Sequence, residues 1–327
     1  SAASDVYKRQ EFDDNRLLPQ LFGSHNIHLA RIEQELDVSL NSKGNLVTIS
    51  GVHELADTAG IVLKGLYARL KDGHNVDSTE VDVALRMIAA GEKGKAALKN
   101  AKVYAVRTRK RHIMPRSPQQ ACYLDLIGRS DLTFGLGPAG TGKTYLAVAK
   151  AVEALVKGEI DRIILSRPAV EAGEQLGFLP GDMREKVDPY LRPLYDALHD
   201  MLPYNQVATK IENGEIEIAP LAFMRGRTLD NAFVILDEAQ NTTSVQMKMF
   251  LTRLGENARM VVTGDLSQID LPAGVASGLG DAVSRLRGVK GVSFVEFGEA
   301  DVVRHALVLS LIHISEPTRP RLISYAV

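Results

Sequence analysis

The sequence contains one cysteine, Cys122, and no tryptophan among its 327 residues. A single cysteine excludes an intramolecular disulfide and a zinc site built from several cysteines. Cys122 lies in an apolar helical pattern, so we expect a buried, unreactive thiol. No stretch approaches the ~20 consecutive apolar residues of a membrane-spanning helix, and no signal peptide is visible at the start. These absences favour a cytoplasmic protein with no membrane association.

The sequence also lacks an excess of charge of either sign. Its formal net charge is −1 and its isoelectric point is about 6.7. This balance gives no overall bias toward nucleic acid or membrane surfaces, although a local basic patch is compatible with it. The length suffices for one large domain or two smaller ones.

The two ends do not fit the segments they flank. Residues 1–10 and residues 309–327 continue no neighbouring pattern, and the second stretch carries two prolines without an amphipathic period. Genuine disordered termini are one explanation. Both strings resemble translated sequencing-adapter sequence, so we interpret them as non-native tails and exclude them from the fold. On this interpretation the core is truncated near residue 308.

Residues 11–90 predict a small α+β domain. A helix over residues 27–38 precedes two strands joined at the turn signal Lys43-Gly44-Asn45. Further helices are expected over residues 54–71 and 79–90, the second capped by Ser78.

This order of elements resembles the KH-like RNA-binding domain. Residues 23–26 (GSHN) nevertheless lack the second glycine of the GXXG clamp that holds the RNA backbone. A docking or oligomerisation module therefore has comparable weight.

Residues 91–117 are expected to form a basic linker. Every charged residue from Lys99 to Arg116 is positive, and apolar residues lie between them. Such a run is usually a solvated surface, but a contact with a phosphate backbone is an equal alternative.

Residues 118–308 predict a P-loop ATPase core of the RecA/helicase-like α/β type. Short apolar runs separated by helical segments are typical of a parallel sheet between helices. We expect strands over residues 132–136, 162–166, 233–236, 260–263 and 293–297.

The segment from Gly137 to Thr144 matches the phosphate-binding pattern G-x-x-x-x-G-K-[ST], between an expected strand and an expected helix over residues 144–156. Its backbone N–H groups and the helix N-terminus attract phosphates, Lys143 reaches the β- and γ-phosphates, and the Thr144 hydroxyl binds Mg²⁺. The predicted nucleotide-binding residues here are Gly137, Pro138, Ala139, Gly140, Thr141, Gly142, Lys143, Thr144 and Tyr145.

Two carboxylates follow the apolar strand at residues 233–236. Asp237, at the end of the strand, is predicted to hold Mg²⁺ directly or through water. Glu238 is placed to act as the general base that polarises the attacking water.

Two glutamines complete the predicted site. Gln268 follows another apolar strand and can sense the γ-phosphate and the attacking water. Gln120, upstream of the first core strand, can read the adenine edge. The guanine-reading N/T-K-x-D signature is missing where GTPases need it, so ATP is favoured over GTP.

Together these residues resemble the PhoH-like ATPase family over most of residues 12–308. The resemblance implies a single superfamily 1 helicase-like core, a KH-like N-terminal domain, a role in RNA metabolism and an endoribonuclease partner. Its most specific stretches are Gly137–Ala149, Ser166–Glu174, Leu176–Asp182, Asp188–Tyr195, Arg225–Leu229, Val234–Thr242 and Thr263–Pro272.

A single core raises the question of where the catalytic arginine comes from. Helicase-like cores usually take it from a second core, so we expect a homo-oligomeric ring, a hexamer by family resemblance, with an arginine acting in trans. Arg253 is our candidate; an ordinary surface arginine paired with Glu256 is the alternative. The segment over residues 167–193 offers either RNA contacts or subunit packing.

Two functions remain open at this point. One is Mg²⁺-dependent ATP hydrolysis coupled to binding or remodelling of single-stranded RNA. The other is an ATP-switched binding module that recruits a partner, such as an endoribonuclease, without unwinding RNA.

Overall fold

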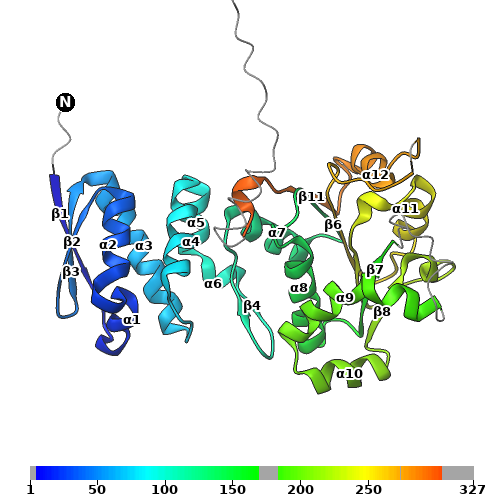
Figure 1. The fold of residues 1–327 in the computed structure, drawn as a ribbon, viewed down its shortest axis with the longest axis horizontal. Coiled ribbons are helices and arrows are strands. Elements are labelled where there is room, and N and C mark those ends of the chain that lie inside the picture. Colours follow the sequence, from blue (N-terminus) through cyan, green and yellow to red (C-terminus); the bar gives the residue numbers. More distant parts are fainter. Residues whose placement is uncertain (1–4, 169–182, 273, 304–327) are drawn as a thin grey trace, which may run out of the picture.

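The computed structural model describes residues 5–168, 183–272 and 274–303. A small α+β unit lies at one end of the molecule, and a larger α/β core lies at the other (Figure 1). Of the described helices, none is long and apolar enough to cross a membrane.

The first unit is a three-stranded antiparallel sheet covered by helices. The strand order is β1-β3-β2, with β3 in the centre. The sheet packs mainly against α3, whose buried face includes Leu63 and Leu66. The elements are β1 (Asp5–Glu11), α1 (Leu18–Phe22), α2 (Ile27–Leu36), β2 (Ser39–Lys43), β3 (Leu46–Val52), α3 (His53–Lys71) and α4 (Ser78–Ala89).

Two details of this unit differ from the sequence-based expectation. Residues 5–10, which we had set outside the fold, form most of β1, which pairs along the whole of β3. The cap of α4 is Asp77, whose carboxylate accepts a hydrogen bond from the Glu80 N–H, and not Ser78. Ser78 is already the first residue of the helix, because the extended backbone that a cap requires belongs to Asp77.

The expected linker over residues 91–117 is folded. It contains α5 (Glu92–Lys99), α6 (Ala101–Tyr104) and a short hairpin of β4 (Val106–Arg107) and β5 (His112–Ile113). Leu98 of α5 is buried in the core of the first unit, whereas Val106 is buried in the core of the α/β unit. The segment is therefore shared between the two hydrophobic cores.

The larger unit is built on a six-stranded parallel sheet with the order β11-β6-β10-β9-β7-β8. All five expected strands are present within a residue of their predicted ends. Edge strand β8 was not expected, because its run is short and ends in Pro220. The strands are β6 (Leu132–Leu136), β7 (Arg162–Arg167), β8 (Ile216–Pro220), β9 (Ala232–Leu236), β10 (Arg259–Gly264) and β11 (Val292–Glu296).

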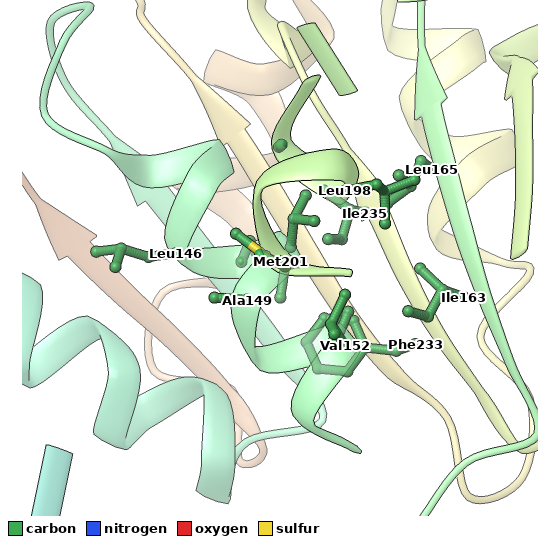
Figure 2. Close-up of a cluster of buried hydrophobic side chains, with 14 of the residues drawn as sticks. Leu146, Ala149, Val152, Ile163, Leu165, Leu198, Met201, Phe233 and Ile235 are labelled. Atoms are coloured by element: carbon green, nitrogen blue, oxygen red, sulfur yellow. The ribbon is translucent and has the colours of Figure 1, made fainter. Parts of the chain in front are cut away.

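Helices cover both faces of this sheet. Figure 2 shows side chains of α8 and α9 packed against those of β7 and β9 on one face. Met247 and Phe250 of α11 pack on the other face with residues of α12. The helices are α7 (Pro118–Arg129), α8 (Lys143–Lys157), α9 (Met183–Met201), α10 (Tyr204–Glu212), α11 (Ser244–Leu251) and α12 (Gly278–Leu286).

Cys122 on α7 is exposed, contrary to the expectation of a buried thiol. Its neighbours Ala121 and Tyr123 are buried in the cores of the first unit and of the α/β unit respectively, so the helical rotation of about 100° per residue turns the Cys122 side chain outward. The parallel order and the helical cover nevertheless confirm the predicted P-loop α/β class for the core.

Candidate nucleotide and hydrolysis site

The phosphate-binding pattern forms a loop between β6 and α8, as predicted. Gly137 has φ 133°, and a Cβ there would lie 2.3 Å from the carbonyl oxygen of Phe297. Gly142, at φ 80°, is the N-cap of α8. The loop can thus adopt its curve only with glycine at these positions, and it directs the N-terminus of α8 toward the space above the sheet.

Lys143 is held against the loop by its own ammonium group. Its Nζ donates hydrogen bonds to the carbonyl oxygens of Gly137 at 2.6 Å and Pro138 at 2.7 Å. Burial lowers the pKa of Lys143, and the nearby carboxylates of Asp265, Asp237 and Glu238 offset this effect only in part. A positive charge fixed at the mouth of the loop is what the β- and γ-phosphates require.

Asp237 joins the phosphate loop to two strands of the sheet. Thr144 donates from its hydroxyl to Asp237 Oδ1 at 2.6 Å, and Thr263 donates to the same oxygen at 2.7 Å. β9 and β10 are neighbours and parallel, so Asp237 and Thr263 come from adjacent carboxyl ends. The predicted metal residues Thr144 and Asp237 are therefore in contact.

Asp265 adds a buried carboxylate beside this group. Its Oδ1 accepts hydrogen bonds from the backbone and side chain of Ser267, whereas its Oδ2 is buried and has no hydrogen-bond partner within the described residues. A buried carboxylate oxygen without a donor is costly unless a ligand or ion satisfies it. Oxygen donors at Thr144, Asp237 and Asp265 are the type that Mg²⁺ prefers.

Glu238 lies at the edge of the same space with an unusual backbone conformation. Its φ is 52°, in the left-handed region, and its side chain remains about 38% exposed. Arg167, at the end of β7, lies 3.3 Å from Glu238 Oε1. Gln240 donates to the other oxygen and accepts a hydrogen bond from the Asp265 N–H. The strained residue is thus held by neighbours on both sides, as is common at functional sites.

Gln268 reaches the site as predicted. A cavity of about 260 Å³ is lined by Gln268 together with Asp237, Glu238, Asp265 and residues of the phosphate loop. The cavity therefore gathers the predicted phosphate, metal and base residues at one edge of the sheet, where parallel α/β folds bind ligands.

Gln120 is adjacent to the phosphate loop, but both ends of its amide are engaged within the protein. Its Oε1 accepts from the Arg116 N–H at 2.7 Å, and its Nε2 donates to the Thr141 carbonyl at 2.9 Å. Gln120 also lines a second cavity, which includes Tyr145. Reading of the adenine edge by Gln120 stays a prediction.

Arg253 and the phosphate loop of the same chain lie at opposite ends of the sheet strands. Its backbone pairs with Leu229, which precedes β9, so it lies near the amino ends of the strands. Its guanidinium donates to the carbonyl oxygens of Met249 and Arg227. The guanidinium is thus engaged away from the phosphate loop of its own chain, and action of Arg253 on the site of another subunit stays a prediction.

Four further residues of the site, namely Arg167, Gln240, Thr263 and Asp265, had no individual role at the phosphate site assigned from the sequence, although residues 263–268 were expected as a polar cluster at this sheet edge. Each follows or ends an apolar strand of the sheet, and this position was the available signal. The sequence could not show which of them turn toward Asp237 and Glu238.

The arrangement combines the parts that phosphoanhydride hydrolysis needs. The loop and Lys143 bind and orient phosphates, and Glu238 can accept a proton from water. Mg²⁺ held by Thr144 and Asp237 would neutralise charge on the phosphate oxygens.

Comparisons with known proteins agree with this geometry. A family model described as PhoH-like protein matches residues 112–316, past residue 308, where we had ended the resemblance. The chain is 50% identical over 299 residues to a PhoH-like protein of Bacillus subtilis (strain 168), covering 89% of this chain and 92% of that one. It is 47% identical over 297 residues to a PhoH-like protein of Mycobacterium tuberculosis (strain ATCC 25618 / H37Rv), covering 90% and 84%.

A solved structure, the Sulfolobus solfataricus SWI2/SNF2 ATPase core in complex with dsDNA, is 16% identical, with a TM-score of 0.32. It covers 49% of this chain and 33% of that chain.

Proposed function

Because the chain belongs to the PhoH-like protein family, we propose that it hydrolyses ATP with Mg²⁺ and couples this reaction to the binding or remodelling of single-stranded RNA. Family and fold make the chain a nucleotide-dependent ATPase. The observation that best supports hydrolysis is the hydrogen-bonded group of Thr144, Asp237 and Thr263 directly beside the phosphate loop.

In this proposal the residues of the site have distinct roles. The phosphate loop and Lys143 hold the β- and γ-phosphates, while Thr144 and Asp237 hold the metal ion. Glu238 takes the proton of the attacking water, and Gln268 orients that water. Gln240 and Arg167 fix the direction of the Glu238 carboxylate.

Coupling to RNA is supported by the hairpin of β4 and β5. Arg107, Arg109 and Lys110 are exposed on it, and Lys110 also donates to the carbonyl of His199 in α9. Exposed cations attract the phosphate backbone of a nucleic acid by counterion release. The hairpin packs through Val106 against the hydrophobic core that contains α8, the helix that follows the phosphate loop. RNA bound to the hairpin would therefore be connected to the nucleotide site through α8.

We further propose that the active form is a homo-oligomer, namely a hexameric ring. In this ring Arg253 acts on the phosphate site of a neighbouring subunit. The support is its position near the amino ends of the strands. An endoribonuclease remains a proposed partner, based on the family resemblance alone.

An ATP-switched binding module is the second candidate. The observation that favours it is the contact of the first unit with the second cavity, through Arg69 and Glu80. Such a contact would let nucleotide binding change the surface offered by the first unit.

The two candidates differ in how RNA affects turnover. Steady-state ATP hydrolysis is measured with and without single-stranded RNA at two salt concentrations. The hairpin variant Arg107→Gln/Arg109→Gln is compared with Lys290→Gln as a control distant in sequence. The remodelling enzyme predicts RNA stimulation that weakens with salt and in the hairpin variant. Turnover indifferent to RNA would contradict it and leave the switched module.

A further inference from the structure

A second cavity of about 430 Å³ adjoins the phosphate cavity. The two share Gly140, Gly142 and Tyr145 as lining residues. A nucleotide whose phosphates lie on the loop must place its ribose and base in adjoining space. The second cavity has this position, and its lining includes residues of α3, of α4 and of the segment after the β4–β5 hairpin.

The first unit contributes a guanidinium group and a carboxylate to this cavity. Arg69 of α3 is only 2% exposed, and its Nη1 donates to the carboxylate of Glu80 in α4. Arg69 Nε and Nη2 are buried without a hydrogen-bond partner among the described residues. Arg116 approaches the other oxygen of Glu80, with its Nη2 at 3.8 Å. Glu80 thus stands between two guanidinium groups at the wall of the cavity.

Glu80 is also connected to the phosphate loop. The Arg116 N–H donates to Gln120, and Gln120 in turn donates to the carbonyl of Thr141. The Asp77 cap fixes the backbone of Glu80 at the start of α4. These contacts place Glu80 at a defined position relative to the loop that binds the phosphates.

We propose that Glu80 selects adenine in this cavity. Adenine presents an amino-group donor beside a ring-nitrogen acceptor, whereas guanine presents an oxygen acceptor in place of that amino group. The Glu80 carboxylate accepts from the amino group, and the Arg116 guanidinium donates to the ring nitrogen. A guanine base in the same orientation would place its oxygen against this carboxylate, which repels that oxygen. The inference rests on the proposed function, because it requires a nucleotide on the phosphate loop.

The simpler explanation is that Glu80 only neutralises the buried Arg69. The Glu80 side chain is 22% exposed, so it is accessible from the cavity. A carboxylate offers about four lone-pair sites. It can therefore bind both arginines and still accept from a ligand.

The test compares the affinities of fluorescent ATP and GTP analogues for the full chain and for Glu80→Gln. A glutamine amide can donate to the guanine oxygen, so we expect the preference for ATP over GTP to fall by about tenfold or more. Glu92→Gln, an exposed glutamate of the first unit that pairs with Lys95 outside the cavity, should keep the preference. A folded Glu80→Gln variant with an unchanged preference, or a wild type without one, overturns the proposal.

A second measurement uses the wild type and does not depend on the stability of a variant. Photolysis of bound 8-azido-ATP should label residues 69–80 or 111–116. Labelling confined to elements of the α/β core that do not line this cavity would overturn the proposal.

Lys143→Ala separates this inference from the proposed function. It should weaken both nucleotides and leave their ratio unchanged. Wild-type affinity in Lys143→Ala would contradict the phosphate site and, with it, the proposed function. An unchanged ratio in Glu80→Gln beside weak binding in Lys143→Ala would contradict adenine selection alone.

Discussion

The Thr263 hydroxyl lies 2.7 Å from Asp237 Oδ1, the oxygen that also accepts a hydrogen bond from Thr144. Thr263 comes from β10, the strand that separates the phosphate-loop strand β6 from β9. Asp237 is therefore oriented by a residue that does not itself line the phosphate cavity. Residues of this kind tune metal binding through the ligand they hold.

Thr263→Val should weaken Mg²⁺ binding while leaving the fold intact. Valine has nearly the same shape, but it cannot donate to Asp237. Loss of such an outer contact typically costs about 10–100-fold in metal affinity. The Mg²⁺ dependence of ATP hydrolysis measures this loss. Thr209→Val, at an exposed position on α10, is the matched control, and equal Mg²⁺ requirements in both variants would contradict the role of Thr263.

Glu238→Gln should bind ATP normally and hydrolyse it poorly. The amide keeps the size of the side chain and can still contact Gln240, but it cannot take a proton from water. General-base catalysis contributes about 10²–10⁴-fold, so turnover should fall within that range. Binding of a fluorescent ATP analogue and steady-state turnover are measured on the same preparation. Normal turnover would remove Glu238 from the mechanism.

Gly137→Ala should abolish nucleotide binding and destabilise the core. The added Cβ would meet the Phe297 carbonyl at 2.3 Å, and φ 133° is unfavourable for alanine. A residue forced into such a region costs about 1–3 kcal/mol, before the clash is counted. Gly128→Ala on α7, where a Cβ has open space, should bind ATP normally and be slightly more stable. Chemical denaturation and nucleotide binding test both variants; intact binding in Gly137→Ala would contradict the loop geometry.

The first unit should lose stability in acid through Asp13. Hydrogen bonds from Lys71 and Tyr67 lower the pKa of Asp13 from 3.8 to about 2. Because the folded pKa is depressed, the stabilisation is present above pH 3.8 and is lost as the pH falls toward 2. Asp13→Asn should therefore be less stable than wild type at pH 6, with a difference that shrinks below pH 3.8. A difference that stays constant between pH 6 and pH 2.5 would contradict this coupling.

The sequence predicted the parts of the fold in which local pattern and tertiary environment agree. The apolar run before Asp237 and the glycine-rich loop both specify a buried strand that ends in a site, so β9 and β6 were found. Family membership confirms the resemblance to PhoH-like proteins. Edge strand β8 was missed because a strand with one neighbour needs no long apolar run.

Other features depend on contacts between distant segments. The folding of residues 91–117 follows from two separate hydrophobic cores, which a charge pattern does not reveal. The orientation of Asp265 and Gln240 toward the site, and the meeting of Glu80 with Arg116, require the tertiary structure. The chemical type of these residues can be read from the sequence, but their neighbours cannot.

The most direct test of the central claim is steady-state ATP hydrolysis by the wild type and by Lys143→Ala, each with and without single-stranded RNA. We predict turnover that requires Lys143 and Mg²⁺ and rises several-fold when RNA is added. Turnover that survives the loss of Lys143 would contradict the assignment of the phosphate loop as the catalytic site.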